Sequence, residues 1–130
     1  MEIISVSLDK EALENLDTIQ QRLGFKSRSK LLRSTITSLV NEYYTIDSIR
    51  GSNEIVLVIT YKINEKNHIS SLLHRFEHSI KTTIHKHHGR SCVDIIDIIA
   101  DAKVIQNMVH MLKKNKCVRS VNFILVGKIG

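Results

Sequence analysis

The sequence predicts an α+β fold in two parts, a short strand–helix–helix part followed by a longer part with the order βαββαβ. Residues 2–8 alternate between apolar and polar side chains, which is typical of a half-buried strand. Two stretches with helical apolar spacing follow, and residues 45–53 then contain Asp, Ser, Gly and Asn. We therefore expect one domain over residues 1–45, a linker over Thr45–Asn53 and a second domain over residues 54–130.

The first part is expected to hold one strand, Glu2–Leu8, and two helices. Asp9 can cap the first helix and Gly24 can end it, because a short polar side chain suits a helix start and glycine tolerates the left-handed conformation at a helix end. Ser27 can cap the second helix. One strand and two helices cannot pair the strand's edges or bury a core alone. We therefore expect dimerisation through paired strands and helices.

The second part starts with a strongly apolar strand, Ile55–Ile59. After it we expect a helix, two strands, a helix and a last strand, at Glu65–Lys81, Thr82–His88, Cys92–Ile99, Asp101–Asn115 and Cys117–Val126. This order is the ferredoxin-like arrangement, a fold that hosts many unrelated functions. The function must therefore be argued from particular side chains.

Composition narrows the class of protein. No apolar run approaches the roughly 20 residues that cross a bilayer, and no export signal is evident, so we expect a cytoplasmic protein with no membrane partner. Only two cysteines are present, which argues against a disulfide scaffold. The net charge is +6, and five basic residues with no acidic one lie between Thr18 and Asn41. This run predicts either a local positive surface or a solvated helix face.

A cluster of imidazoles and a thiol is the most informative chemical feature. His85 and His87 are two apart, so in a strand they point to the same face, and a loop brings Cys92 back beside them. Two imidazoles and a thiolate are good ligands for a borderline divalent metal. His74 and His78 lie upstream at helical spacing. The pattern predicts a metal site, and the alternative is a His-rich strand edge with Cys92 as a small core residue.

Short matches spread over nearly the whole chain point to one family. In the first part they are Leu8-Asp9, Gln21-Arg22, Gly24, Arg28-Ser29 and Arg33. In the second part they are His74, His85-Lys86-His87 and Cys92-Val93-Asp94. On these residues the chain resembles the nickel-responsive transcriptional repressors, NikR. In that family a ribbon-helix-helix DNA-binding domain is joined to an ACT-type regulatory domain.

The resemblance implies a metal site and an assembly. His85, His87 and Cys92 of one chain would be three ligands of a square-planar Ni(II) ion, and His74 of a neighbouring chain would be the fourth. The protein would then be a homotetramer, a dimer of dimers. Nitrogen and thiolate ligands in a square plane suit Ni(II) or Cu(II) on general grounds too.

The resemblance also implies double-stranded operator DNA as the partner. The paired N-terminal strands would enter the major groove, where Ser5 and Ser7 would face base edges. Ser29 and the backbone at the start of the second helix would hold phosphate, with Arg28 and Arg33 beside them.

This chain departs from the family's pattern in three places. Ile3 stands where the family has a basic residue that reads guanine. The loop from His87 to Cys92 is one residue shorter. Lys30 and Ser34 replace acidic residues early in the second helix, so no accessory cation site is expected there.

Three functions are open on the sequence. The first is a metal-responsive repressor that binds DNA. The second is a DNA-binding regulator of the same build whose second domain senses another small ligand or no metal. The third is a metal buffer or carrier that does not bind DNA. No nucleophile with a positioned base is evident, so we do not expect an enzyme.

Overall fold

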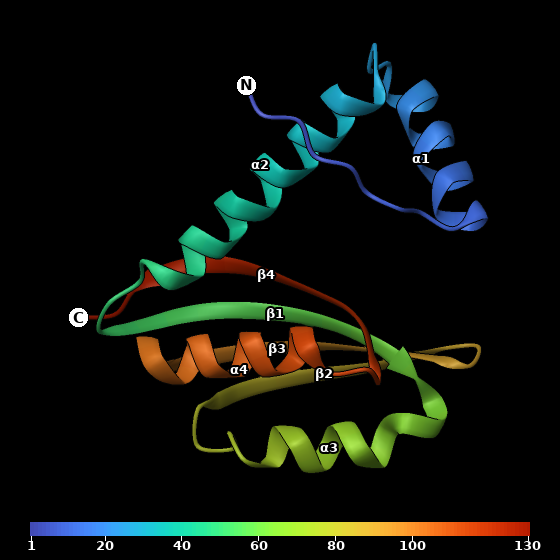
Figure 1. Cartoon of the computed structure of the whole chain (residues 1–130). Coiled ribbons are helices and arrows are strands. Elements are labelled where there is room, and N and C mark those ends of the chain that lie inside the picture. Colours follow the sequence, from blue (N-terminus) through green and yellow to red (C-terminus); the bar gives the residue numbers. More distant parts are fainter. The chain divides into compact units, whose positions relative to one another are not determined.

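The computed structural model describes all 130 residues, and the chain divides into two compact units, Met1–Thr45 and Ile46–Gly130. The first unit holds α1 (Lys10–Leu23) and most of α2 (Arg28–Asp47). The second holds β1 (Ser52–Lys62), the 3-10 turn η1 (Ile63–Glu65), α3 (Lys66–His74), β2 (Ile80–His88), β3 (Ser91–Asp101), α4 (Ala102–Lys114) and β4 (Val118–Lys128) (Figure 1). None of the helices combines the length and the apolar character needed to span a bilayer.

The helix ends in the first unit confirm the three expected caps. The Asp9 side chain accepts a hydrogen bond from the backbone N–H of Ala12 at 2.8 Å, so α1 starts there. Gly24 ends α1 with φ of 76°, the left-handed conformation that glycine adopts without a steric penalty. The Ser27 hydroxyl accepts a hydrogen bond from the backbone N–H of Lys30 at 3.1 Å at the start of α2.

The expected strand Glu2–Leu8 does not form in the single chain. Residues 1–9 belong to no helix or strand, and all of them are exposed. Their apolar positions are exposed as well, with Ile4 at 81% and Val6 at 67%. A strand needs a neighbouring backbone to pair with its N–H and C=O groups, and this unit offers no other strand. The alternation therefore describes a segment that requires a partner.

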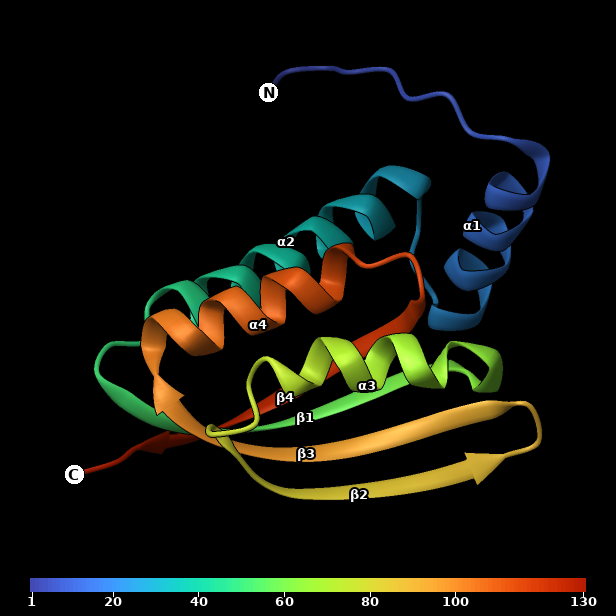
Figure 2. The ribbon, with the colours of Figure 1, turned by 90° about the horizontal axis from the view of Figure 1, so that it is seen from below.

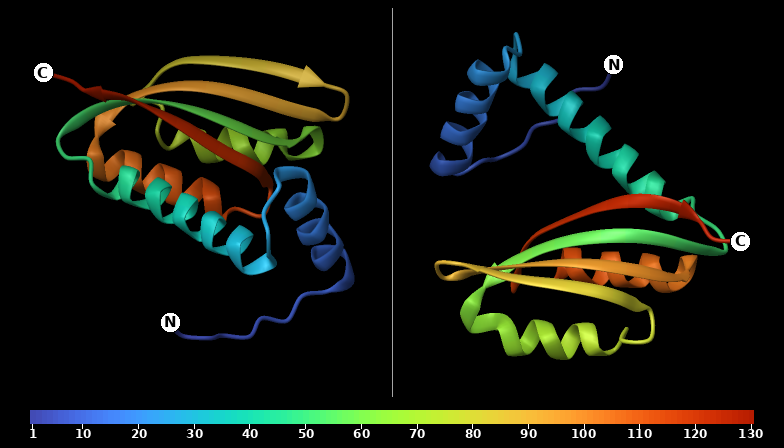
Figure 3. Two further views of the ribbon diagram at one scale, coloured as in Figure 1. Left: turned by 90° about the horizontal axis from the view of Figure 1, so that it is seen from above. Right: turned by 180° about the vertical axis from the view of Figure 1, so that it is seen from behind.

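The second unit is a four-stranded antiparallel sheet with the order β2-β3-β1-β4. Both α3 and α4 lie on one face of it, and the β2–β3 hairpin closes at the end where β1 leads into α3 (Figures 2 and 3). The core lies between that face and the helices. Its fully buried residues from β1 and α4 are Ile55, Leu57, Ile59, Tyr61, Ile105, Met108 and Leu112. The expected α+β class and βαββαβ order are confirmed.

The helix expected over Glu65–Lys81 is shorter in the structure. α3 ends at His74, and a turn joined by a hydrogen bond from Ile80 N to Phe76 O leads directly into β2. Phe76 and Ile80 continue the apolar spacing of a helix, but they pack against the core from this turn and strand. Tertiary packing therefore overrides the periodicity, and His78 does not share a helical face with His74.

The linker expected over Thr45–Asn53 is also shorter. α2 continues to Asp47 and β1 begins at Ser52. Ile46 and Ile49 are only 2% and 7% exposed and belong to the core of the second unit. The side chain of Gln106 in α4 donates hydrogen bonds to the carbonyls of Ile46 and Asp47, at 3.1 and 3.3 Å. Polar composition indicated a loop, but these two isoleucines fix most of the segment by burial.

Candidate metal centre and candidate nucleic-acid interface

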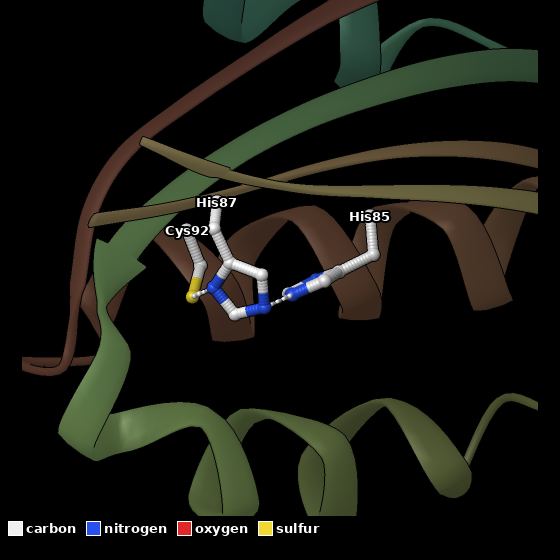
Figure 4. A group of neighbouring side chains, drawn as sticks. All are labelled: His85, His87 and Cys92. Carbon is white, nitrogen blue, oxygen red and sulfur yellow. Dashed lines mark hydrogen bonds between the residues drawn. The ribbon is translucent and has the colours of Figure 1, made fainter. Parts of the chain in front are cut away.

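The β2–β3 hairpin brings His85, His87 and Cys92 together. In the antiparallel register His87 lies opposite Cys92, and His85 lies opposite Asp94. All four therefore share the face of the sheet that carries the helices. The potential ligand atoms of His85, His87 and Cys92 all lie within 4.8 Å of one another. Figure 4 shows the three side chains pointing from the strands toward the side on which α3 lies.

The three side chains contact one another directly. His85 Nε2 lies 3.2 Å from His87 Nε2, and Cys92 Sγ lies 3.5 Å from His87 Nδ1 (Figure 4). Cys92 is fully buried, whereas His87 is exposed. A cluster with two imidazoles and one thiol suits a borderline or soft divalent ion better than the oxygen-preferring Mg²⁺ or Ca²⁺.

A buried carboxylate orients His85. The Nδ1 atom of His85 pairs with the Asp94 carboxylate, and the Tyr61 hydroxyl donates a hydrogen bond of 2.7 Å to the other oxygen of Asp94. Asp94 is 4% exposed. With Nδ1 occupied, Nε2 of His85 is the nitrogen that faces His87. A carboxylate behind a histidine is a common way to fix the tautomer and ring orientation of a metal ligand.

Tyr61 completes this buried pair as a permanent donor. Burial raises the pKa of the Tyr61 phenol, and the hydrogen bond to Asp94 and the charge of that carboxylate raise it further. The phenol therefore keeps its proton. Sequence reasoning used Asp94 only as a family match and missed Tyr61. The available signal for Asp94 was its position two residues after Cys92, on the same strand face.

His74 lies in the last turn of α3, apart from the group of three. Its Nδ1 atom is 3.1 Å from a carboxylate oxygen of Glu77, and its side chain is 75% exposed. Together with His85 it lines a cavity of about 460 Å³ between α3 and the sheet. The expected role of His74, as a ligand from a neighbouring chain, stays a prediction because one chain is described.

The candidate DNA-contacting residues lie in the first unit. Ser5 and Ser7 are exposed on the extended N-terminal segment, and Ser29 and Arg33 are exposed in the first turns of α2. Their contacts with DNA stay predictions. They are free of the core, as such contacts require.

Arg28 differs from these residues because it already has a partner. Its guanidinium donates two hydrogen bonds to the Asp17 carboxylate, at 2.8 and 2.9 Å. The hydrogen bond from Arg28 holds the pKa of Asp17 below its usual range. The ion pair ties α1 to the start of α2. Sequence reasoning missed Asp17, since a separation of eleven residues across a turn carries no local signal.

Comparison with known proteins defines the class. Residues 2–43 match the family described as "Ribbon-helix-helix protein, copG family". The two helices with their capped ends and the extended N-terminal segment that lacks a strand partner fit that match. The chain is a ribbon-helix-helix transcription regulator and not an enzyme.

Full-length relatives narrow the family. The chain is 27% identical to a "Putative nickel-responsive regulator" of Methanococcus aeolicus, over 93% of this chain and 89% of that one. Identity is 28% to a protein of that name from Methanococcoides burtonii, over 91% and 87% of the two chains. It is 29% to one from Methanococcus vannielii, over 93% and 89%. The chain belongs to the NikR-like regulators.

A solved structure supports the fold alone. An uncharacterized protein from Thermotoga maritima superposes with a TM-score of 0.53 at 19% identity. The match covers 58% of this chain and 98% of that one.

Proposed function

We propose that this chain is a nickel-responsive repressor that binds operator DNA through residues 1–45 and Ni(II) through an ACT-type domain over residues 54–130. His85, His87 and Cys92 would be ligands from one chain, and His74 of a neighbouring chain would complete the site. The observation that carries the proposal is the convergence of two imidazoles and a buried thiol within 4.8 Å. Their class of donors fits nickel, which accepts imidazole and thiolate ligands.

The metal would act by joining chains. A homotetramer built as a dimer of dimers carries two pairs of N-terminal segments, and simultaneous binding of two half-sites raises the overall affinity. Nickel can promote this state only if it binds the DNA-competent arrangement more tightly than the others. A ligand set shared between chains supplies that preference, because the site is complete only when His74 of one chain meets His85, His87 and Cys92 of another.

DNA recognition would follow from pairing of the N-terminal segments. Two copies of residues 2–8 would form a two-stranded ribbon, which fits the major groove. Ile4 and Val6 would then be covered by the partner, and Ser5 and Ser7 would face the bases. Ser29 and Arg33 would contact phosphate. Arg28 would reach phosphate only by giving up its ion pair with Asp17.

A second candidate is a DNA-binding regulator whose second domain senses another small ligand. The observation that favours it is the cavity of about 460 Å³ beside the metal cluster, a volume typical of sites for small molecules. Lys66, Ser70 and His74 give that cavity polar groups on the helix side. In this case the His–Cys cluster would be a polar extension of the same cavity.

The two cysteines offer a matched test of the proposal. Nickel added to the untagged full chain should produce a thiolate-to-metal charge-transfer band in the absorption spectrum. Cys92→Ser should remove the band, and Cys117→Ser should keep it, because Cys117 lies outside the cluster. A band that survives Cys92→Ser would reject the ligand set. Operator binding by a protein that takes up no nickel would support the second candidate.

A further inference from the structure

The sheet has a second face, turned away from α3 and α4, which we call the open face (Figures 1 and 2). Its central residues are all aliphatic and belong to all four strands: Val56, Val58, Ile84, Val93, Ile95 and Ile124. Ile84, Ile95 and Ile124 are 56%, 39% and 67% exposed. An apolar patch of this kind on one side of a domain indicates an interaction surface.

The sequence of β1 supports the same reading. Ile55–Ile59 is a continuous apolar run, which is typical of a strand that is buried on both faces. In the single chain only Ile55, Leu57 and Ile59 are buried, on the helix side. Val56 and Val58 point to the open face, where no helix of this unit covers them. The pattern calls for a second layer.

Charges at the two ends of the open face are of opposite sign. Glu54 and Asp97 lie at one end, on neighbouring strands, and Lys62 and Lys86 lie at the other, with Arg119 beside them on β4. About 27 Å of strand separates Glu54 from Lys62, at 3.4 Å per residue. The face is therefore self-complementary in charge: its acidic end fits the basic end of an identical face.

The acidic end lacks a cation within its own chain. Glu54 and Asp97 share a hydrogen bond, and this bond, burial and the charge of Asp97 raise the pKa of Glu54. The Oδ1 atom of Asp97 is buried and has no hydrogen-bond partner. Buried carboxylate oxygens normally have a partner, so a donor from outside the chain is expected at this position.

We propose that the open face binds the open face of a second copy of this chain, related by a two-fold axis that lies in the interface and runs across the strands near Val58. This operation lays β1 antiparallel on β1 of the second copy. It places Glu54 over Lys62 of the second copy, because both are four residues from Val58. It also brings Asp97 toward the end of the second sheet that carries Lys86.

The size of the face is sufficient for such a contact. Four strands at about 4.8 Å spacing and about 27 Å of length give roughly 500 Å² per copy. The pair would bury about 1,000 Å², the lower limit for a specific interface, with sheets packed about 10 Å apart. The proposal adds a defined surface to the proposed homotetramer, and this surface is distinct from the metal cluster on the helix side.

The first test measures the mass of the metal-free full chain by sedimentation equilibrium with a chelator present. The wild type should be larger than a dimer. Ile95→Lys should weaken assembly at least about tenfold and leave the ribbon-helix-helix dimer, since a lysine would be buried at the centre of the contact. Ile63→Lys is the matched control, because Ile63 is 42% exposed in η1, off the open face, and its substitution should leave the mass unchanged.

The second test checks the arrangement by exchanging charges. Glu54→Lys and Lys62→Glu should each weaken assembly, and the double variant should restore it, because each acidic end meets a basic end. A double variant no better than either single variant would overturn the two-fold arrangement. Equal masses for wild type, Ile95→Lys and Ile63→Lys, or a wild type no larger than a dimer, would overturn the interface. The nickel band and operator binding, measured in parallel, report separately on the proposed function.

Discussion

Asp94 offers the sharpest test of how the metal cluster is built, through the substitution Asp94→Asn. The carboxylate is 4% exposed, pairs with His85 Nδ1 and accepts a hydrogen bond from Tyr61. Asparagine keeps the shape but has one acceptor oxygen, so it can serve Tyr61 or His85 and not both. The substitution therefore removes the charge that holds His85 while leaving the packing nearly unchanged.

The magnitude follows from the contact that is lost. A hydrogen bond to a charged group contributes about 1.5–3 kcal/mol. Substitution of a residue that orients a metal ligand typically weakens metal affinity by about 10- to 100-fold, which corresponds to about 1.4–2.7 kcal/mol. The two scales agree, so we expect Asp94→Asn to weaken nickel binding by about 10- to 100-fold. Tyr61→Phe leaves the carboxylate in place, and we expect a loss below about tenfold.

Competition between the protein and a chelator of known nickel affinity would measure both variants, with urea unfolding as the check that each is folded. Nickel affinity equal to wild type in a folded Asp94→Asn protein would refute the reasoning, because the carboxylate would then contribute nothing to the orientation of His85. An equal loss in Asp94→Asn and Tyr61→Phe would instead indicate general loosening of this part of the core.

The remaining predictions concern protons, DNA and stability. Nickel affinity should fall as the pH is lowered from about 8 to about 5, because imidazole and thiolate ligands must lose protons to bind metal; chelator competition across this range checks it, and a flat profile would exclude such ligands. Arg33→Ala should weaken binding to every DNA sequence and reduce the salt slope by about 1, whereas Ser5→Ala and Ser7→Ala should change sequence preference in binding titrations; a uniform loss in the serine variants would argue against base readout. Ile46→Ala should lower the free energy of unfolding by about 2–5 kcal/mol in urea, because its side chain is 2% exposed in the core of the second unit; a loss below about 1 kcal/mol would place it outside that core.

The sequence by itself determined the elements and the chemistry. Capping residues such as Asp9 and Gly24 act on backbone groups within a few residues, so their effects could be read locally. The alternation of His85 and His87 in a strand fixed a shared face, and the turn after it returned Cys92 to that face. Sequence reasoning therefore predicted the class of fold, the order βαββαβ and the three residues that the structure brings together.

Only the tertiary structure decided what depends on contacts between distant residues. The helix expected to reach Lys81 ends at His74, and the linker is shortened, because Phe76, Ile80, Ile46 and Ile49 are buried by packing that no local spacing reveals. The strand over residues 2–8 needs a second chain, so a single chain leaves it unpaired. The orientation of His85 by Asp94 and Tyr61, and the ion pair between Asp17 and Arg28, join elements that the chain brings together only when folded. Hydrogen bonds and burial act at contact distance, and contact distance is set by the fold.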